Sequence, residues 1–463
     1  MLKYFTKYKF HLFLFIIALF GLWLRFINYD KIPGFGVTQD EFAYTWAGMS
    51  LIKTGVPIAW SWMPSYTNRV LVSYFGNDYP MVSPWLDAPP LYSILSGSVA
   101  LIFGEKEFDQ VRLSTIRLLP IILSFFSIIL FGYLAKSAFN ESVSLISSAL
   151  YATVPTIVLS NRLSLTENLL TPLILATILI FTLVKNGNWA KFKPYLIGLG
   201  CGLALLTKGI GVTLLISVSF LFLSQKHWRS LLIVLLISLL LGSSYLLLGY
   251  KFGFNFFLNI LNDVRQWHSE GLPEAVSNIL RFPTISDKHT LFLDGTILSG
   301  FIILLSAPFW SKYQNFKIGP KFLILFFPYF YLLFLLLSIS GGNDGIKWYG
   351  WYLFPLFPFA TILLAKLFNN LWFKFDIFIL TFFLLTIGAS SLRFLLILIP
   401  TLRNYWQYIL IFIILLILGC SVVRNIKFQR LFLIAGFAAI LIINILVILN
   451  FDLFYPLKSQ PFF

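Results

Sequence analysis

Long apolar runs, separated by short polar gaps, dominate the pattern of this chain. Because a helix needs about 20 apolar residues to cross a bilayer, we interpret thirteen of these runs as transmembrane helices. They lie near 10–28, 118–136, 143–160, 168–185, 194–207, 209–224, 230–249, 291–309, 322–339, 350–368, 375–391, 405–421 and 431–450. The pattern therefore predicts an all-α polytopic membrane protein.

The run 89–103 is apolar but short and begins with two prolines, so we keep it on the outer side as a juxtamembrane helix. With that choice, the inner loops contain half of the 34 Lys and Arg residues and only two of the 18 Asp and Glu residues. Basic residues accumulate in cytoplasmic loops. This distribution predicts a cytoplasmic N-terminus and a shared outer face for the polar loops.

The same topology predicts one transmembrane domain over residues 1–463. Its first outer loop spans 29–117 and carries juxtamembrane helices, and its second large outer loop spans 250–290. The last run ends close to the C-terminus, so no soluble C-terminal domain is expected. Trp23 and Arg25, near the end of the N-terminal run, stand where a small-residue cleavage site would lie, which favours an uncleaved first span.

Composition agrees with a membrane location: 59% of residues are hydrophobic, 11% are charged and the mean hydropathy is +0.86. The net charge of +16 comes from residues between apolar runs, so it does not indicate nucleic-acid binding. Cys201 and Cys420 lie inside apolar runs, which argues against a disulfide framework. We find neither a P-loop nor a dinucleotide-binding glycine pattern.

The adjacent carboxylates Asp40 and Glu41 follow the first span. Ionisable groups at a membrane are costly to desolvate and often mark functional sites. A carboxylate is suited to removing a proton from an attacking hydroxyl or amine. The alternative is that both acids only stabilise the start of a short helix.

Two further outer segments place polar residues on the same side as Asp40. Asp87 precedes Pro89-Pro90, and Arg162 and Glu167 occupy the turn after the third span. The alternatives are helix caps for Asp87 and Glu167, and a snorkelling side chain for Arg162.

Lys208 joins two short spans, so we expect it at lipid-headgroup depth, where a lipid phosphate is a suitable anion. The remaining candidates are weaker. Asp87 and His268 are candidate ligands for a divalent metal, the one cofactor that the residues suggest, with a solvated loop as the alternative. Lys347, Tyr349 and their aromatic neighbours are either an interfacial anchor or part of a pocket.

Taken in order, these segments resemble GT-C membrane glycosyltransferases, in the branch of protein O-mannosyltransferases and the lipid A aminoarabinose transferase. The resemblance rests on Asp40-Glu41, on Asp87-Ala-Pro-Pro-Leu-Tyr, on Arg112 and Arg117 ahead of a span, on Arg162 with Glu167, and on the segment ending in Lys208-Gly209. It covers most of residues 10–225. Ala88 stands where the aminoarabinose transferase has a lysine, so the resemblance does not identify the sugar.

The resemblance implies transfer of a sugar, with inversion, from a polyprenyl-phosphate carrier to a lipid, glycan or protein acceptor. Asp40 matches the family's acidic residue, and Glu41 its neighbour. The donor phosphate would be bound by Lys208 and Arg162, with Arg117 and Lys347 as further candidates. Candidates for contacting the acceptor or sugar are Glu167, Tyr92 and Tyr349. The expected location is the prokaryotic plasma membrane, with the site on its outer face.

Two other functions fit a polytopic chain. A lipid or polysaccharide transporter would favour inverted repeats and helices broken near the membrane centre, and neither is visible in the sequence. A non-catalytic scaffold would tolerate neutral replacements at Asp40, Arg162 and Lys208.

Overall fold

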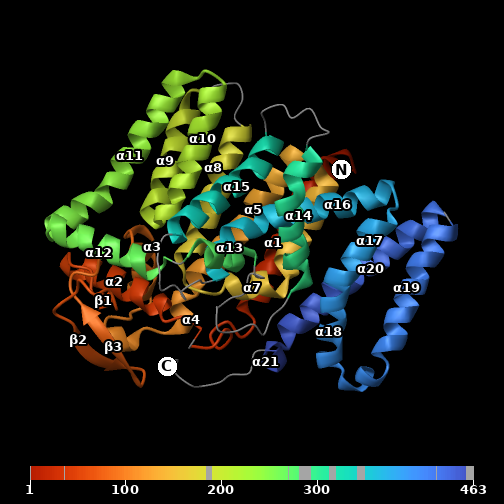
Figure 1. Cartoon of the computed structure of the whole chain (residues 1–463), viewed down its shortest axis with the longest axis horizontal. Coiled ribbons are helices and arrows are strands. Elements are labelled where there is room, and N and C mark those ends of the chain that lie inside the picture. Colours follow the sequence, from red (N-terminus) through yellow and green to blue (C-terminus); the bar gives the residue numbers. More distant parts are fainter. Residues whose placement is uncertain are drawn as a thin grey trace.

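The computed structural model describes residues 2–35, 37–183, 190–269, 271–280, 294–311, 320–340, 350–423 and 425–454. Long helices pack side by side, and a smaller unit built from the first outer loop covers one end of the bundle (Figure 1). The C-terminal helices form the opposite flank in that view (Figure 1).

Eight helical stretches of the described chain are long and apolar enough to cross a membrane. They are α1 (Leu2–Phe26), α4 with α5 (Leu113–Ile116, Leu118–Ala138), α8 (Thr166–Leu183), α11 (Trp228–Lys251), α15 (Pro320–Ile339), η4 with α16 (Gly350–Leu356, Phe357–Phe373), α17 with α18 (Ile377–Phe383, Ala389–Leu398, joined by the π-helical η5, Leu384–Gly388) and α20 (Ile426–Leu449).

The other predicted spans are helical but shorter, so the count of thirteen crossings is not confirmed. The segment 143–160 is divided by Pro155, which cannot donate the backbone hydrogen bond that a continuous helix needs at this position. These shorter helices are α6 (Glu141–Thr153), α7 (Pro155–Ser160), α9 (Lys193–Thr207), α10 (Val212–Ser224), α14 (Gly295–Ser311) and α19 (Trp406–Val423).

The predicted helical fold class is confirmed, and the segment of the predicted first outer loop adds a small antiparallel sheet that was not predicted. The strands β1 (Ala59–Trp60), β2 (Val70–Tyr74) and β3 (Asn77–Val82) lie in the order β1-β3-β2. Tyr74 pairs with Asn77 across a two-residue turn at Phe75-Gly76, both with positive φ, a conformation that suits a tight hairpin. The sheet packs on α2 (Asp40–Thr54) through the buried Trp46.

Two glycines allow α2 to cross α3 (Leu91–Ile102) at very short range. A Cβ atom on Gly48 would lie 1.7 Å from the carbonyl oxygen of Ser93, and one on Gly97 would lie 2.3 Å from the backbone nitrogen of Met49. Because α2 is enclosed in this way, it is buried around most of its circumference. The crossing fixes the start of α2 relative to the chain that enters α3.

The second large outer loop begins with α12 (Phe254–Trp267), which docks on the first-loop unit. The ring of Phe256 packs against Tyr66 at 5.6 Å, and the backbone N–H of Ser65 donates to Asp263 Oδ2 at 2.6 Å. The two outer loops therefore form one layer over the bundle. The remaining elements are η1 (Phe108–Gln110), η2 (Ala190–Phe192), η3 (Gly209–Gly211), α13 (Leu272–Leu280), η6 (Pro400–Asn404) and α21 (Phe451–Phe454).

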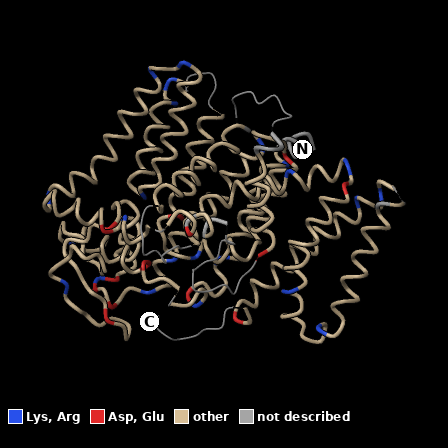
Figure 2. The backbone as a smooth tube through the Cα atoms, viewed as in Figure 1, with Lys and Arg blue, Asp and Glu red and all other residues tan. Residues whose placement is uncertain are grey.

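Charge is distributed unevenly between the two ends of the bundle. Lys and Arg at the α10–α11, α16–α17 and α19–α20 turns lie along the upper edge of Figure 2, and most Asp and Glu lie in the lower half, toward the outer-loop unit. We call the upper edge the basic end of the molecule.

Candidate active site

A cavity of about 440 Å³ lies where the outer-loop layer meets the bundle. Its walls come from the start of α2, the chain before α3, the turn between α9 and η3, and parts of α12, α15 and η4. The lining residues are Asp40, Tyr44, Asp87, Ala88, Pro89, Thr166, Lys208, Gly209, Ile210, Tyr245, Leu261, Val264, Arg265, His268, Tyr331, Phe334, Leu335, Ser338, Ile339, Trp351 and Tyr352. Asp40 and Lys208 thus share one cavity, as the sequence predicts.

Asp40 is the first residue of α2, and its backbone N–H donates to Thr38 Oγ1 at 3.2 Å. Burial raises the pKa of the Asp40 carboxyl to about 6, because desolvation disfavours the charged form. Lys208 opposes this shift through its positive charge, whereas the Glu167 carboxylate adds to it. The carboxyl group is therefore ionised at neutral pH but remains a stronger base than an exposed aspartate.

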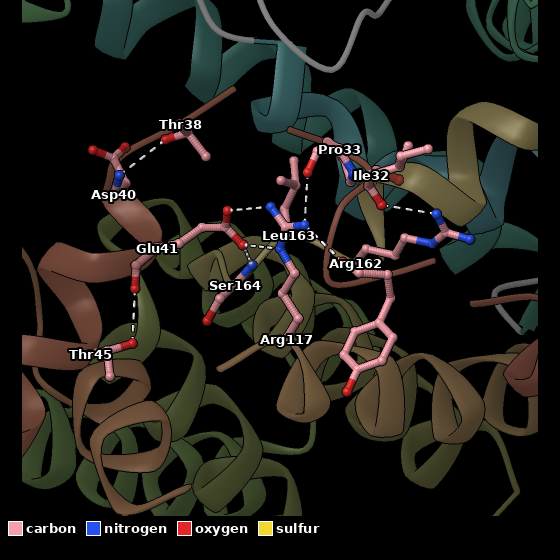
Figure 3. Close-up of polar contacts among 12 residues, drawn as sticks. Ile32, Pro33, Thr38, Asp40, Glu41, Thr45, Arg117, Arg162, Leu163 and Ser164 are labelled. Carbon is pink, nitrogen blue, oxygen red and sulfur yellow. Dashed lines mark hydrogen bonds and ion pairs between the residues drawn. The ribbon is translucent and has the colours of Figure 1, made fainter. Parts of the chain in front are cut away.

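Glu41 points away from the cavity, although it is the next residue along the chain. Successive helical residues are rotated by about 100°, and Figure 3 shows the Glu41 carboxylate directed toward Arg117 and Ser164. Its oxygens accept hydrogen bonds from Arg117 Nε at 3.0 Å and Nη2 at 2.8 Å, and both side chains are fully buried. The assignment of Glu41 as a catalytic residue does not fit this geometry.

Arg117 is bound on its remaining side as well. Its Nη1 donates to the carbonyl oxygens of Tyr29 and Pro33, both at 2.8 Å, so its donors are used inside the protein. Arg117 therefore does not reach a donor phosphate and instead ties α2 to the segment after α1.

Arg162 is also buried behind the cavity wall. It donates to the carbonyl oxygens of Ile32 and Leu24, both at 2.9 Å, and its guanidinium lies 5.0 Å from the Phe451 ring centroid (Figure 3 shows the Ile32 contact). Burial, with the nearby charges of Arg117 and Arg25, lowers the pKa of Arg162 to about 9. Arg162 donates to backbone carbonyls and does not line the cavity. The predicted contact between Arg162 and the donor phosphate is therefore not supported.

Of the predicted phosphate-binding residues in the described ranges, Lys208 is the one that lines the cavity. Its ammonium forms an ion pair with the almost fully buried carboxylate of Glu167 and lies 4.5 Å from the ring centroid of Tyr352. The sequence predicts that Lys208 meets a lipid phosphate. In the structure, the anion beside Lys208 is the Glu167 carboxylate. Glu167 itself lies behind the lining residue Thr166, whose hydroxyl donates to it at 3.0 Å. It therefore orients Lys208, and a direct contact with acceptor or sugar is not supported.

Asp87 and His268 both line the cavity, as partners of other side chains. The Tyr66 hydroxyl donates to Asp87 Oδ1 at 2.8 Å, and the Tyr352 hydroxyl lies 3.1 Å from His268 Nδ1. Burial raises the pKa of Asp87 to about 7. No group of three metal-ligating side chains is found within the described ranges.

The other candidates lie elsewhere. Tyr92 is fully buried behind Tyr44, with the two rings 5.7 Å apart and its hydroxyl 2.9 Å from Ser164 Oγ. It therefore does not line the cavity. Lys347 and Tyr349 lie outside the described residues.

The cavity has two chemically different parts. Asp40, Asp87, Lys208, Arg265 and His268 provide charge and hydrogen-bonding groups, whereas α15 and neighbouring elements provide an apolar wall of Phe334, Leu335, Ile339, Ile210, Leu261 and Val264. Such a surface fits an amphiphile with an anionic head and a hydrocarbon tail.

Sequence reasoning missed several lining residues. Tyr44 follows Asp40 by four positions, which places the two on one helix face, so helical spacing alone would have indicated it. Tyr245 and Tyr331 sit inside long apolar runs, where a tyrosine carries no comparable signal.

Residues 87–247 match the sequence profile of the family described as dolichyl-phosphate-mannose-protein mannosyltransferase. That match covers the chain from Asp87 through Lys208 to the α11 helix. Together with the fold, this match makes the chain similar to membrane glycosyltransferases with the GT-C fold.

Solved structures of this class superpose along most of the chain. ArnT from Cupriavidus metallidurans bound to undecaprenyl phosphate is 12% identical, with a TM-score of 0.55 over 96% of this chain and 78% of that one. The apo structure of the same protein is 13% identical, with a TM-score of 0.56 over 94% of this chain and 76% of that one. An Archaeoglobus fulgidus oligosaccharyltransferase, in complex with Zn and sulfate, is 16% identical, with a TM-score of 0.50 over 82% of this chain and 52% of that one. At these identities the likeness concerns the fold. No curated protein sequence matches the chain significantly.

Proposed function

We propose that this protein transfers a sugar from a polyprenyl-phosphate carrier to an acceptor, and that the reaction takes place in the cavity shared by Asp40 and Lys208. The observation that carries the proposal is the placement of the Asp40 carboxylate and the Lys208 ammonium on the wall of a single, partly apolar cavity. The family match supports the same reaction class.

The donor's phosphate would lie against Lys208, and its isoprenoid chain against the apolar wall. A developing phosphate charge is stabilised most strongly by a preorganised cation in a site that excludes water. Lys208 is preorganised by Glu167 and Tyr352. The ArnT structure with undecaprenyl phosphate is a precedent for this kind of ligand in this fold.

In the reaction, an acceptor oxygen or nitrogen attacks the anomeric carbon from the side opposite the phosphate, and the configuration is inverted. The bond between the anomeric carbon and the phosphate oxygen breaks, and its electron pair leaves with the polyprenyl phosphate. Asp40 takes the proton of the acceptor, for which its raised pKa makes it a suitable base.

The sugar is a hexose or a pentose, and the acceptor is a lipid, a glycan or a protein. We place the reaction on the non-cytoplasmic side of a prokaryotic plasma membrane, because the cavity lies at the outer-loop layer, away from the basic end.

The test is sugar transfer by the Asp40→Asn variant in membranes containing the polyprenyl-linked donor. Loss of at least a hundredfold in rate is expected, in the range for general base catalysis. Asp78→Asn, an exposed position in β3, is the matched control and should retain full activity. Unchanged turnover by correctly folded Asp40→Asn protein would refute the proposal.

The transporter alternative receives no support from the comparisons. It would be favoured by movement of a sugar-linked lipid across liposome membranes, without sugar transfer, that persists in the Asp40→Asn variant.

A further inference from the structure

A second cavity, of about 410 Å³, lies toward the basic end and shares no residue with the first. Three helices enclose it: α6 provides the floor, and α16 and α20 provide the two walls. In Figure 1 these helices meet where the main bundle joins the C-terminal helices. The cavity therefore occupies a seam between two parts of the fold.

The walls are almost entirely apolar and open toward the outside of the helix bundle. Phe368 and Phe437 face each other with their ring centroids 5.8 Å apart, one from each wall. At the mouth, Phe373 is 69% exposed and Ile434 is 53% exposed. In a bilayer such a mouth faces hydrocarbon, and an acyl chain can enter it without losing an apolar environment.

Asn369 provides an amide among the otherwise aromatic side chains with which α16 lines the cavity. Its side chain lines the cavity, the residue is only 5% exposed, and its amide forms no hydrogen bond with any residue in the described part of the chain. The amide is therefore available to a molecule that occupies the cavity. Its N–H groups are suited to donating to an ester carbonyl.

The depth of Asn369 matches the ester region of a lipid. With a rise of about 1.5 Å per residue, it lies roughly 7 Å before Lys374, where α16 ends at the basic end. A lipid whose chain fills the cavity would thus place its glycerol esters beside Asn369 and its phosphate at the end of the helix.

The end of the cavity is positively charged. The Arg430 guanidinium lies 5.1 Å from the ring centroid of the lining residue Trp372, and its Nε donates to the Trp372 carbonyl at 3.4 Å. Of the nearby acids, Glu141 pairs with Lys136, and Asp376 caps α17. Neither of these acids pairs with Arg430 or Lys374, so both cations are available to a bound anion. Basic pockets between helices on the cytoplasmic side of membranes bind anionic lipid head groups.

We propose that this cavity binds an anionic glycerophospholipid, with an acyl chain between α16 and α20, an ester carbonyl on Asn369 and the phosphate beside Arg430. The bound lipid fills the seam and joins the C-terminal helices to the main bundle. The proposal does not depend on the sugar-transfer reaction.

The experiment measures thermal unfolding of the full chain in detergent micelles while phosphatidylglycerol or phosphatidylcholine with the same acyl chains is added. Phosphatidylglycerol should raise the unfolding temperature by several degrees, and phosphatidylcholine should have less effect. Arg430→Gln should require about tenfold more phosphatidylglycerol for the same shift. Arg229→Gln, an exposed arginine at the same end on α11, should respond as the wild type does. Equal effects of the two lipids, or of the two arginine variants, would overturn the assignment of the phosphate.

Two further variants test the cavity itself. Ala438→Phe places a ring in the cavity from a position already exposed at its mouth, so it should fold and lose the response to phosphatidylglycerol. Asn369→Leu removes the amide while keeping the number and branching of side-chain heavy atoms, so it should unfold at the same or a higher temperature without lipid and respond less to phosphatidylglycerol. A full response in both variants would show that the lipid binds elsewhere.

Discussion

The buried ion pair between Glu41 and Arg117 leads to a specific prediction about stability. The neighbouring carboxyl of Asp40 is assigned a different role, that of the base in sugar transfer. We consider Glu41→Gln, which keeps the size of the side chain and removes its charge. The glutamine can still accept through one oxygen, but its amide nitrogen then meets N–H donors of Arg117 or Ser164, which surround the present carboxylate at 2.8 to 3.0 Å.

The magnitude follows from burial. Both side chains have no exposed surface, so Arg117 would keep its charge without a counter-ion in a dry environment. Removing one partner of a buried ion pair costs about 3–5 kcal/mol. The control is Glu107→Gln, which breaks the Lys53–Glu107 pair at the surface, where 42% and 68% of the two side chains are exposed. An exposed pair contributes at most about 1 kcal/mol.

The assay is the free energy of unfolding in mixed micelles, measured beside the rate of sugar transfer. Glu41→Gln should lose several kcal/mol of stability. Replacing both partners, as Glu41→Leu with Arg117→Met, should restore part of that loss, because no unpaired charge remains. The recovery is incomplete, since the Tyr29 and Pro33 carbonyls lose their donor. A Glu41→Gln loss no larger than that of Glu107→Gln would refute the reasoning.

Three further predictions concern the cavity and its support. Asp40 must be ionised to act as a base, and its pKa is raised to about 6. In a pH–rate profile, the transfer rate should therefore rise with pH up to about 6 and level off above it. A rate that falls with pH over this range would contradict the assignment of Asp40 as the base. Lys208→Gln should reduce kcat/KM for the polyprenyl-linked donor by about a hundredfold, by loss of phosphate stabilisation, and Arg265→Gln in the same cavity serves as the comparison. Gly48→Val should destabilise the protein severely, because its Cβ would overlap the backbone of α3, whereas Gly209→Ala, with no atom within 4 Å of the added carbon, should have little effect on the unfolding temperature.

Several features could be predicted from local sequence because they depend on local physics. The helices follow from apolar runs whose backbone groups must be bonded internally in a membrane, and all thirteen predicted runs are helical in the described residues. The structure brings Asp40 and Lys208 to one cavity, which agrees with the prediction from the alternation of spans and basic loops that both lie at one face. The two-residue hairpin was missed, since a five-residue strand in a polar loop gives little periodic signal.

The sequence by itself determined the fold class, since hydrophobic run length suffices to identify membrane helices. The side of the membrane on which the site lies stays a prediction from the placement of basic residues. Only the tertiary structure decided which charged groups serve the cavity. Asp40 faces it and Glu41 does not, because adjacent residues on α2 point in different directions. Lys208 reaches it, and Arg117 and Arg162 do not, because backbone carbonyls distant in sequence accept their hydrogen bonds. Packing sets such pairings, and packing is not encoded in any local pattern.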